Sequence, residues 1–303
     1  CSFDVTVSDN EAPTTPTLAD VTGECTATAV APTTTDNCAG TITGTTTDAL
    51  TYSTQGTFVI TWNFDDGNGN TTTATQNVIV DDVTPPVTPT LADVTGECAA
   101  TATAPTTTDA CAGTITGTTT DALTYNTQGT FVITWTFADG NGNTTTATQN
   151  VIVDDITAPV TPTLADVTGE CTATAVAPTT TDACAGTITG TTTDALTYST
   201  QGTYVITWNF DDGNGNDIDV TQNVIISDVT PPVTPTLADV TGECIATAVA
   251  PTTTDACAGV ITGTTTDALT YSTQGTFVIT WNFDDGNGND IDVTQNVIIS
   301  DVT

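Results

Sequence analysis

Apolar and polar residues alternate along short stretches of the chain, as in β-strands that bury one face. In residues 57–64, every second side chain is large and apolar, and residues 71–80 form a second extended stretch rich in β-branched residues. Residues 65–70, Asp-Asp-Gly-Asn-Gly-Asn, separate the two stretches and supply what a tight turn requires. The pattern predicts a β-hairpin whose buried face carries Phe58, Ile60, Trp62 and Phe64.

The whole pattern recurs with a period of 73 residues, as the tryptophans show: Trp62, Trp135, Trp208 and Trp281. A period of this length is one small domain, since the layers of a solenoid run about 20–45 residues. The sequence divides into a leader, expected to be the last strand of a preceding repeat, and four copies: 1–11, 12–84, 85–157, 158–230 and 231–303. Shorter alternating segments bring each copy to six or seven predicted strands, with no helical periodicity.

This organisation predicts an all-β chain, a tandem array of four immunoglobulin-like β-sandwich domains joined by short Pro-rich linkers. The first linker spans 81–90, where three prolines within five residues fix the backbone and remove hydrogen-bond donors. Strands of eight to ten residues make each sandwich ~30 Å long, so four copies end to end would reach ~120–160 Å.

The charge balance is extreme, with 36 acidic residues and no Lys, Arg or His. Such a chain repels nucleic acid and anionic membrane, and direct membrane insertion is not expected. Cations and basic surfaces are its natural partners. Nucleophilic catalysis needs a base near the nucleophile, and the chain has no His or Lys that could serve as one. Paired acids such as Asp65 and Asp66 fit a turn better than a glycosidase site, so we expect no enzyme and no required cofactor.

Two groups of oxygen-bearing residues are candidates for calcium. The turn offers Asp and Asn at alternate positions, like the start of a calcium loop, in all four copies: Asp66, Asn68, Asn70, Asp139, Asn141, Asn143, Asp212, Asn214, Asn216, Asp285, Asn287 and Asn289. It lacks the glycine and the bidentate Glu of a complete calcium loop, and a plain hairpin turn accounts for the same residues. The second candidate is the acidic pair Asp81 and Asp82 at the end of a copy. The alternative interpretation is that these two acids are exposed to water and bind no ion.

Several motifs resemble those of hyalin-repeat (HYR) domains. They are the leader 1–13, the segment 31–38 (Ala-Pro-Thr-Thr-Thr-Asp-Asn-Cys) and the Asp-Gly-Asn-Gly-Asn turn after an alternating strand. The Thr-rich copies are similar to arrays in giant surface adhesins of Bacteroidetes, including flavobacterial gliding-motility adhesins of the SprB kind. The resemblance covers the whole chain and implies an immunoglobulin-like fold, an extracellular cell-surface location and a role in adhesion, without catalytic residues.

The cysteine pattern departs from that family. The four copies lack the final-strand cysteine of many members, which only the leader carries, as Cys1. Each copy retains two cysteines, and we expect them to form a disulfide within the copy, as Cys25 would with Cys38. The alternative is that the cysteines are free thiols. Such a bond closes a short loop and stabilises the fold by ~3 kcal/mol, because it restricts the unfolded chain. The equivalent cysteines are Cys98, Cys111, Cys171, Cys184, Cys244 and Cys257. Cys1 has no expected partner here.

The repetition favours a structural function over a single active site. We expect a non-catalytic stalk of a cell-surface adhesin that holds a distal binding region away from the cell, its partners being neighbouring repeats of the same long chain. Two alternatives remain open: the copies themselves bind surface polysaccharide multivalently, or the chain assembles into an extracellular filament.

Overall fold

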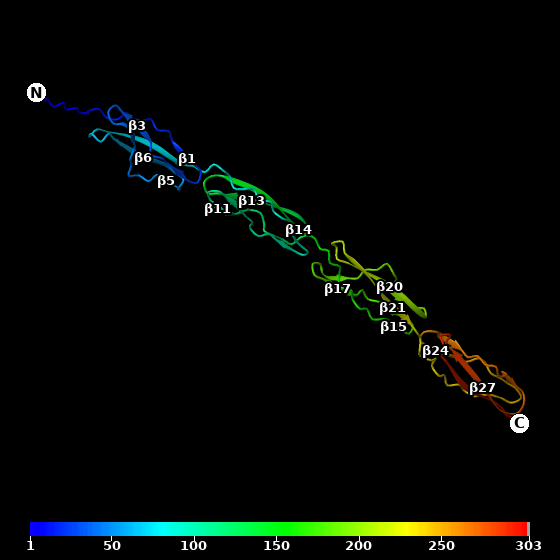
Figure 1. Ribbon diagram of the computed structural model, residues 1–303. Helices are drawn as coiled ribbons and strands as arrows, with labels where there is room; N and C mark the ends of the chain where they lie inside the picture. Colours follow the sequence, from blue (N-terminus) through cyan, green and yellow to red (C-terminus); the bar gives the residue numbers. More distant parts are fainter. Residues whose placement is uncertain (302–303) are drawn as a thin grey trace. The chain divides into compact units, whose positions relative to one another are not determined.

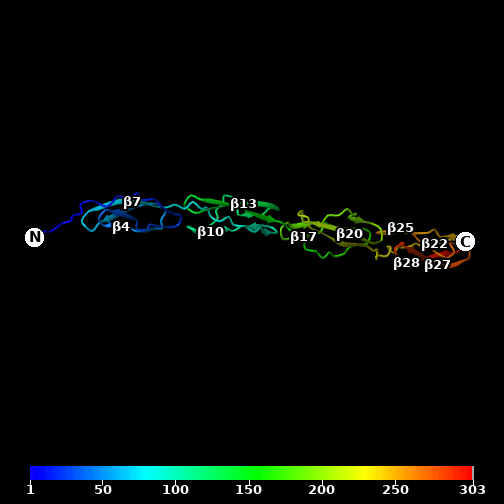
Figure 2. The same cartoon turned by 45° about the horizontal axis from the view of Figure 1, so that its top comes forward.

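The computed structural model describes residues 1–301 and is all-β over that range, without a helix. The chain separates into two compact units, Cys1–Asp154 and Asp155–Thr303, and each contains the strands of two repeats. Within a unit, the strands of one copy group together, as β1, β3, β5 and β6 do in Figure 1 and β4 and β7 do in Figure 2. The predicted fold class is confirmed: four sheet units repeat along the chain.

Every copy contains seven strands in the same order. The first copy has β1 (Val21–Gly23), β2 (Ala27–Thr28), β3 (Thr33–Asp36), β4 (Gly40–Thr43), β5 (Thr51–Tyr52), β6 (Gly56–Asp65) and β7 (Thr71–Val80). The second has β8 (Val94–Gly96), β9 (Ala100–Thr101), β10 (Thr106–Asp109), β11 (Gly113–Thr116), β12 (Thr124–Tyr125), β13 (Gly129–Ala138) and β14 (Thr144–Val153). The third has β15 (Val167–Gly169), β16 (Ala173–Thr174), β17 (Thr179–Asp182), β18 (Gly186–Thr189), β19 (Thr197–Tyr198), β20 (Gly202–Asp211) and β21 (Asp217–Ile226). The fourth has β22 (Val240–Gly242), β23 (Ala246–Thr247), β24 (Thr252–Asp255), β25 (Gly259–Thr262), β26 (Thr270–Tyr271), β27 (Gly275–Asp284) and β28 (Asp290–Ile299).

The predicted hairpin is the main structural element of each copy. β6 and β7 pair antiparallel over their whole length, from Gly56 opposite Val80 to Asp65 opposite Thr71. β1 adds to the far edge of β7 in parallel, with Gly23 opposite Val80. The hairpin β3–β4 and the pair β2–β5 are antiparallel, and Thr45 bridges to Asn63 on β6. The long hairpin therefore orients the copy: its turn marks one end, and the β1–β7 edge marks the other.

The core follows the predicted alternation. Ile60, Trp62 and Phe64 on β6 are at most 1% exposed, whereas Val59 on the opposite face is 54% exposed. The indole Nε1 of Trp62 donates to Oε1 of Gln76 on β7 at 3.1 Å, which satisfies its one polar atom in the interior. Each copy has its own apolar cluster built from the same strands, so the four cores are separate.

The leader and the linker lie outside the strands of the copies. Residues 1–20 contain no strand, and Phe3 and Val7 are more than 80% exposed, so the assignment of the leader to a preceding repeat stays a prediction. A strand forms only against a partner, and the leader pairs with none of the described residues in a ladder. The Pro-rich linker packs on the following copy: Pro86 is buried, and the amide of Val87 donates to the carbonyl of Thr108 at 3.0 Å.

Candidate functional site

The β-turn that joins the two long strands is held by one aspartate. In the second copy this is Asp139, whose Oδ1 accepts hydrogen bonds from the amides of Asn141 at 2.7 Å and Asn143 at 3.1 Å. Its Oδ2 accepts from Nδ2 of Asn143 at 2.7 Å. Gly140 and Gly142 adopt positive φ angles of 86° and 112°, a backbone conformation that glycine tolerates without steric cost. The turn interpretation is therefore confirmed for these residues.

These hydrogen bonds affect ionisation. Desolvation acts to raise the pKa of Asp139, but hydrogen bonds from the Asn143 side chain and from backbone amides outweigh it, so the pKa is lowered. The turn aspartates of the other copies, Asp66, Asp212 and Asp285, have lowered pKa values for the same reason. The turn therefore presents a carboxylate that stays ionised at neutral pH.

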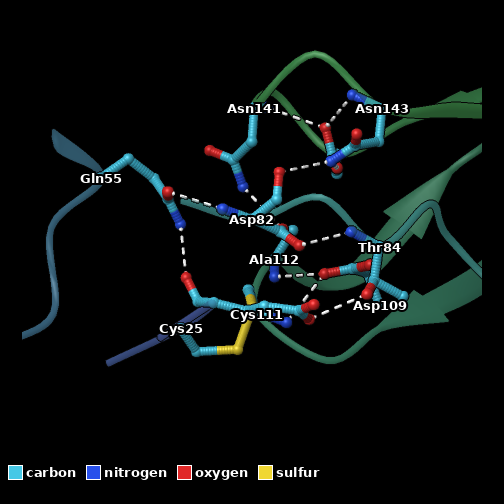
Figure 3. Close-up of a disulfide and its surroundings, with 11 residues drawn as sticks. Cys25, Gln55, Asp82, Thr84, Asp109, Cys111, Ala112, Asn141 and Asn143 are labelled. Atoms are coloured by element: carbon cyan, nitrogen blue, oxygen red, sulfur yellow. Dashed lines mark hydrogen bonds between the residues drawn. A yellow bond between two sulfur atoms is a disulfide. The ribbon is translucent and has the colours of Figure 1, made fainter. Parts of the chain in front are cut away.

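The turn of one copy also binds the end of the preceding copy. Asn141 donates through Nδ2 to Oδ2 of Asp82 at 2.9 Å, and Asn143 donates to the Asp82 carbonyl at 2.8 Å. Asn287 and Asn289 hold Asp228 in the same way in the second unit. The two calcium candidates predicted separately, the turn and the strand-end acids, therefore meet at one place, which we call the junction (Figure 3).

The two strand-end acids have different environments. Asp82 is 3% exposed, and its amide donates to Oε1 of Gln55 in its own copy at 2.9 Å. Asp81 is exposed, and its amide donates to the carbonyl of Gly23. Of the predicted pair, only Asp82 lies in the junction. The turn asparagines donate their amide groups to carboxylates, and their role as metal ligands stays a prediction.

A disulfide crosses the same junction. Cys25 bonds to Cys111, with 4.8 Å between the two Cα atoms, and Cys171 bonds to Cys257 in the second unit. Cys98 and Cys184 are also disulfide-bonded. Among the described residues, Cys1, Cys38 and Cys244 are free and exposed. The predicted bond between Cys25 and Cys38 within one copy is therefore wrong.

The sheet topology explains this pairing. Parallel pairing of β1 with the end of β7 places Cys25 at the C-terminal end of its copy. Cys38 follows β3 in a hairpin turn near Asp9, at the opposite end of the copy. The equivalent turn of copy 2 brings Cys111 to Cys25 instead. The sequence separation is 86 residues, which is the 73-residue period plus the 13 residues between cysteines of one copy.

Sequence reasoning missed a further acidic residue at the junction. Asp109 ends β10 two residues before Cys111, and its Oδ1 accepts from the amides of Cys111 and Ala112, both at 2.8 Å. Asp109 is 8% exposed and, together with Asp82 and Asp139, forms a cluster of three carboxylates. The available signal was the Thr-Asp-x-Cys motif, which recurs before the second cysteine of every copy.

Comparisons with known proteins give weak likenesses. No family model matches the chain, and no curated protein matches it in sequence. The extracellular domain of protocadherin GammaB4 aligns at 14% identity and TM-score 0.31, covering 96% of this chain and 67% of its own. The cis-dimer structure of protocadherin gammaB7 EC3-6 aligns at 12% identity and TM-score 0.30, covering 93% and 98%. A Ca²⁺-stabilized adhesin that helps an Antarctic bacterium reach out and bind ice aligns at 19% identity and TM-score 0.29, covering 91% and 92%.

These three structures are extracellular repeat or adhesion proteins, and this chain shares with them a tandem all-β organisation. TM-scores in this range carry no argument about function, which is drawn below from the chain's own contacts. Residues 1–301 contain no helix long and apolar enough to cross a membrane.

Proposed function

We propose that the chain is a non-catalytic stalk segment of an extracellular, cell-surface adhesin of the hyalin-repeat type. The observation that carries the proposal is the disulfide between neighbouring copies, present in both units. An enzyme or an independent binding module needs no covalent bond to the next copy. A stalk under tension does, because the bond carries load from one copy to the next.

The disulfide changes how the chain responds to pulling. Between Cys25 and Cys111, whose sequence separation is 86, lie the core strands β6 and β7 of the first copy. Force applied to the chain ends passes through the sulfur–sulfur bond and bypasses that whole segment. Unfolding of the bypassed residues then adds no length, although the same residues fully extended would span about 280 Å.

The location follows from the same chemistry. Disulfides persist in oxidising environments, so a chain whose copies are joined by them belongs outside the cytosol. The charge of −36, spread over all copies, keeps neighbouring molecules apart and disfavours the filament alternative. The acidic junctions also fit the calcium predicted from the sequence, and a cation there would help the disulfide to fix one copy on the next.

Single-molecule pulling from the two chain ends tests the proposal. The fully extended oxidised chain should be shorter than the reduced chain by at least roughly 560 Å, because two bonds each hide about 85 residues. Disulfides within copies would hide only about 40 Å each. Cys38→Ser with Cys244→Ser is the matched control and should keep the oxidised length. Equal oxidised and reduced lengths would refute the load-bearing role.

A binding assay separates the stalk from the multivalent alternative. The oxidised full chain, applied to an array of surface polysaccharides, should give no signal above that of an acidic control protein. Saturable binding by the copies themselves would overturn the spacer role in favour of polysaccharide recognition. The pulling result would stand either way, since it reports how load passes between copies.

A further inference from the structure

Three carboxylates from three separate segments meet at the junction between the first two copies. Asp82 follows β7, Asp109 ends β10, and Asp139 lies in the turn between β13 and β14. One carboxylate oxygen from each lies within 4.8 Å of the other two. Asp82 is 3% exposed, Asp109 is 8% exposed and Asp139 is half-buried, so two of the three carboxylates are largely shielded from solvent.

One oxygen in this cluster has no partner. Both oxygens of Asp82 accept hydrogen bonds, Oδ1 from the Thr84 amide and Oδ2 from Asn141. Oδ1 of Asp109 accepts two backbone hydrogen bonds, but its Oδ2 is buried and makes none. A buried carboxylate oxygen without a partner costs free energy, and such atoms are rare in folded proteins. The fold therefore leaves a strong acceptor without a partner on a carboxylate that lies beside two others.

The chain cannot neutralise this cluster from within. It contains no Lys, Arg or His, so no side chain can form an ion pair with any of the three acids. Three negative charges within a few ångströms repel one another strongly when water is excluded. An external cation placed between the carboxylates would relieve this repulsion.

We propose that the junction binds a calcium ion between Asp82, Asp109 and Asp139, and that Asp228, Asp255 and Asp285 form the equivalent site in the second unit. The ligands are hard carboxylate oxygens, which suit calcium and magnesium and not the metals that prefer nitrogen or sulfur. Calcium accepts six to eight oxygens in irregular geometry, whereas magnesium demands a near-ideal octahedron. Ligands from three independent segments favour the more tolerant ion.

The second junction brings together the equivalent residues Asp228 and Asp255. Asp228 is 6% exposed and Asp255 is 7% exposed, and each offers an oxygen to one further cluster with the sulfur of Cys257. Because Cys257 is in a disulfide, its sulfur is a poor ligand, and the carboxylates remain as donors. Asn287, in the turn headed by Asp285, donates to Asp228 at 3.0 Å, as Asn141 does to Asp82.

The proposed site differs from both sites predicted from the sequence. It takes the aspartate of the turn and one strand-end acid, adds Asp109, and omits the exposed Asp81. It does not rest on the stalk function, because a titration reports ligand binding whereas the pulling experiment reports load. Failure of one leaves the other standing.

Calorimetric titration of the oxidised full chain with CaCl₂, at about 150 mM NaCl so that diffuse attraction is screened, tests the site. We expect saturable binding, weaker binding of MgCl₂, and a higher melting temperature in calcium than in chelator. Asp109→Asn with Asp255→Asn should bind two ions fewer. Each substitution keeps an oxygen for the two backbone amides, so the turn is preserved, and in Asp109→Asn the NH₂ group replaces the unpartnered oxygen.

Asp81→Asn with Asp154→Asn is the matched control, because it removes two exposed carboxylates and the same charge. It should bind calcium as the unmodified chain does. Equal binding by the Asp109 and Asp255 variant would assign the calcium to the diffuse ion atmosphere and overturn the proposal. So would an unmodified chain whose melting temperature is the same in calcium and in chelator. Melting of each variant in chelator verifies that it folds.

Discussion

The core of a copy and the junction between copies are built from opposite chemistry. Within the core, Trp62 and its neighbours exclude water by apolar packing, and almost every contact lies inside one copy. The junction combines Asp82, Asp109, amide groups and a disulfide from two copies. The core therefore depends on burial, while the junction depends on oxidation state and ions.

This difference separates folding from assembly. A copy of 73 residues buries a small core, which alone gives marginal stability. The junction adds to it covalently, because each disulfide joins two copies instead of closing a loop in one. Damage to the core should therefore stay within a copy, whereas damage to the junction should weaken two copies together.

The largest effect is expected from the core. Trp135→Ala should lower the free energy of unfolding by ~3–5 kcal/mol, because it removes a side chain that is 1% exposed and leaves a cavity. Val132→Ala on the opposite face of β13, where the side chain is 54% exposed, should change it by about 0.5 kcal/mol. Chemical denaturation of the oxidised chain measures both. Similar losses for the two variants would contradict the two-faced strand.

An intermediate effect is expected from the disulfide. Cys25→Ser with Cys111→Ser should destabilise the first unit by ~2–4 kcal/mol, since the bond closes a loop of 86 residues in the unfolded chain. Cys38→Ser should have almost no effect, because that thiol is free in the structure.

The control also decides the pairing. If cysteines paired within copies, Cys38→Ser would break the Cys25–Cys38 bond and destabilise the first copy by ~3 kcal/mol. Peptide mapping gives an independent answer: cleavage after acidic residues, under non-reducing conditions, should yield one linked peptide that contains Cys25 and Cys111. Trypsin is unsuitable because the chain has no Lys or Arg.

The core could be predicted from the sequence because its information is local. Alternation over 57–64 predicts which face of β6 is buried, and Asp-Gly-Asn-Gly-Asn predicts the turn, without knowledge of any distant residue. The parallel pairing of β1 with β7 is different, since it joins the beginning of a copy to its end. No local pattern predicts such a contact.

The junction could be predicted only in part, because equivalent residues of successive copies have the same local sequence and cannot be told apart as partners. Cys38 and Cys111 occupy the same position in successive copies, so the sequence cannot show which of them bonds Cys25. For the same reason, Asp82 and the turn of Asp139 gave two separate calcium candidates, although they belong to one site. Asp109 was missed because its role arises from burial, which only the fold provides.

The smallest change in the free energy of unfolding is expected from the loss of single hydrogen bonds. One bond at the junction and one inside a copy allow the two regions to be compared directly. Asn143 donates across the junction to the Asp82 carbonyl at 2.8 Å, and within its own turn to the Asp139 carboxylate at 2.7 Å. Asn150 donates to Oδ1 of Asp93 within one copy at 2.9 Å, and this bond is exposed. Asn143→Ala should lower the free energy of unfolding by ~1–2 kcal/mol, because it leaves part-buried acceptors unpaired. Asn150→Ala should lower it by about 0.5 kcal/mol.

Chelator in the buffer keeps cation binding out of this measurement, and the disulfide stays intact in both variants. The loss caused by Asn143→Ala should also shrink when Cys25 and Cys111 are both replaced by Ser. Once the covalent bond is gone, the two copies can separate, and the acceptors on Asp82 reach water. A double-mutant cycle in which the two losses simply add would show that the hydrogen bonds and the disulfide act independently. The junction would then be a set of separate contacts and not one cooperative element.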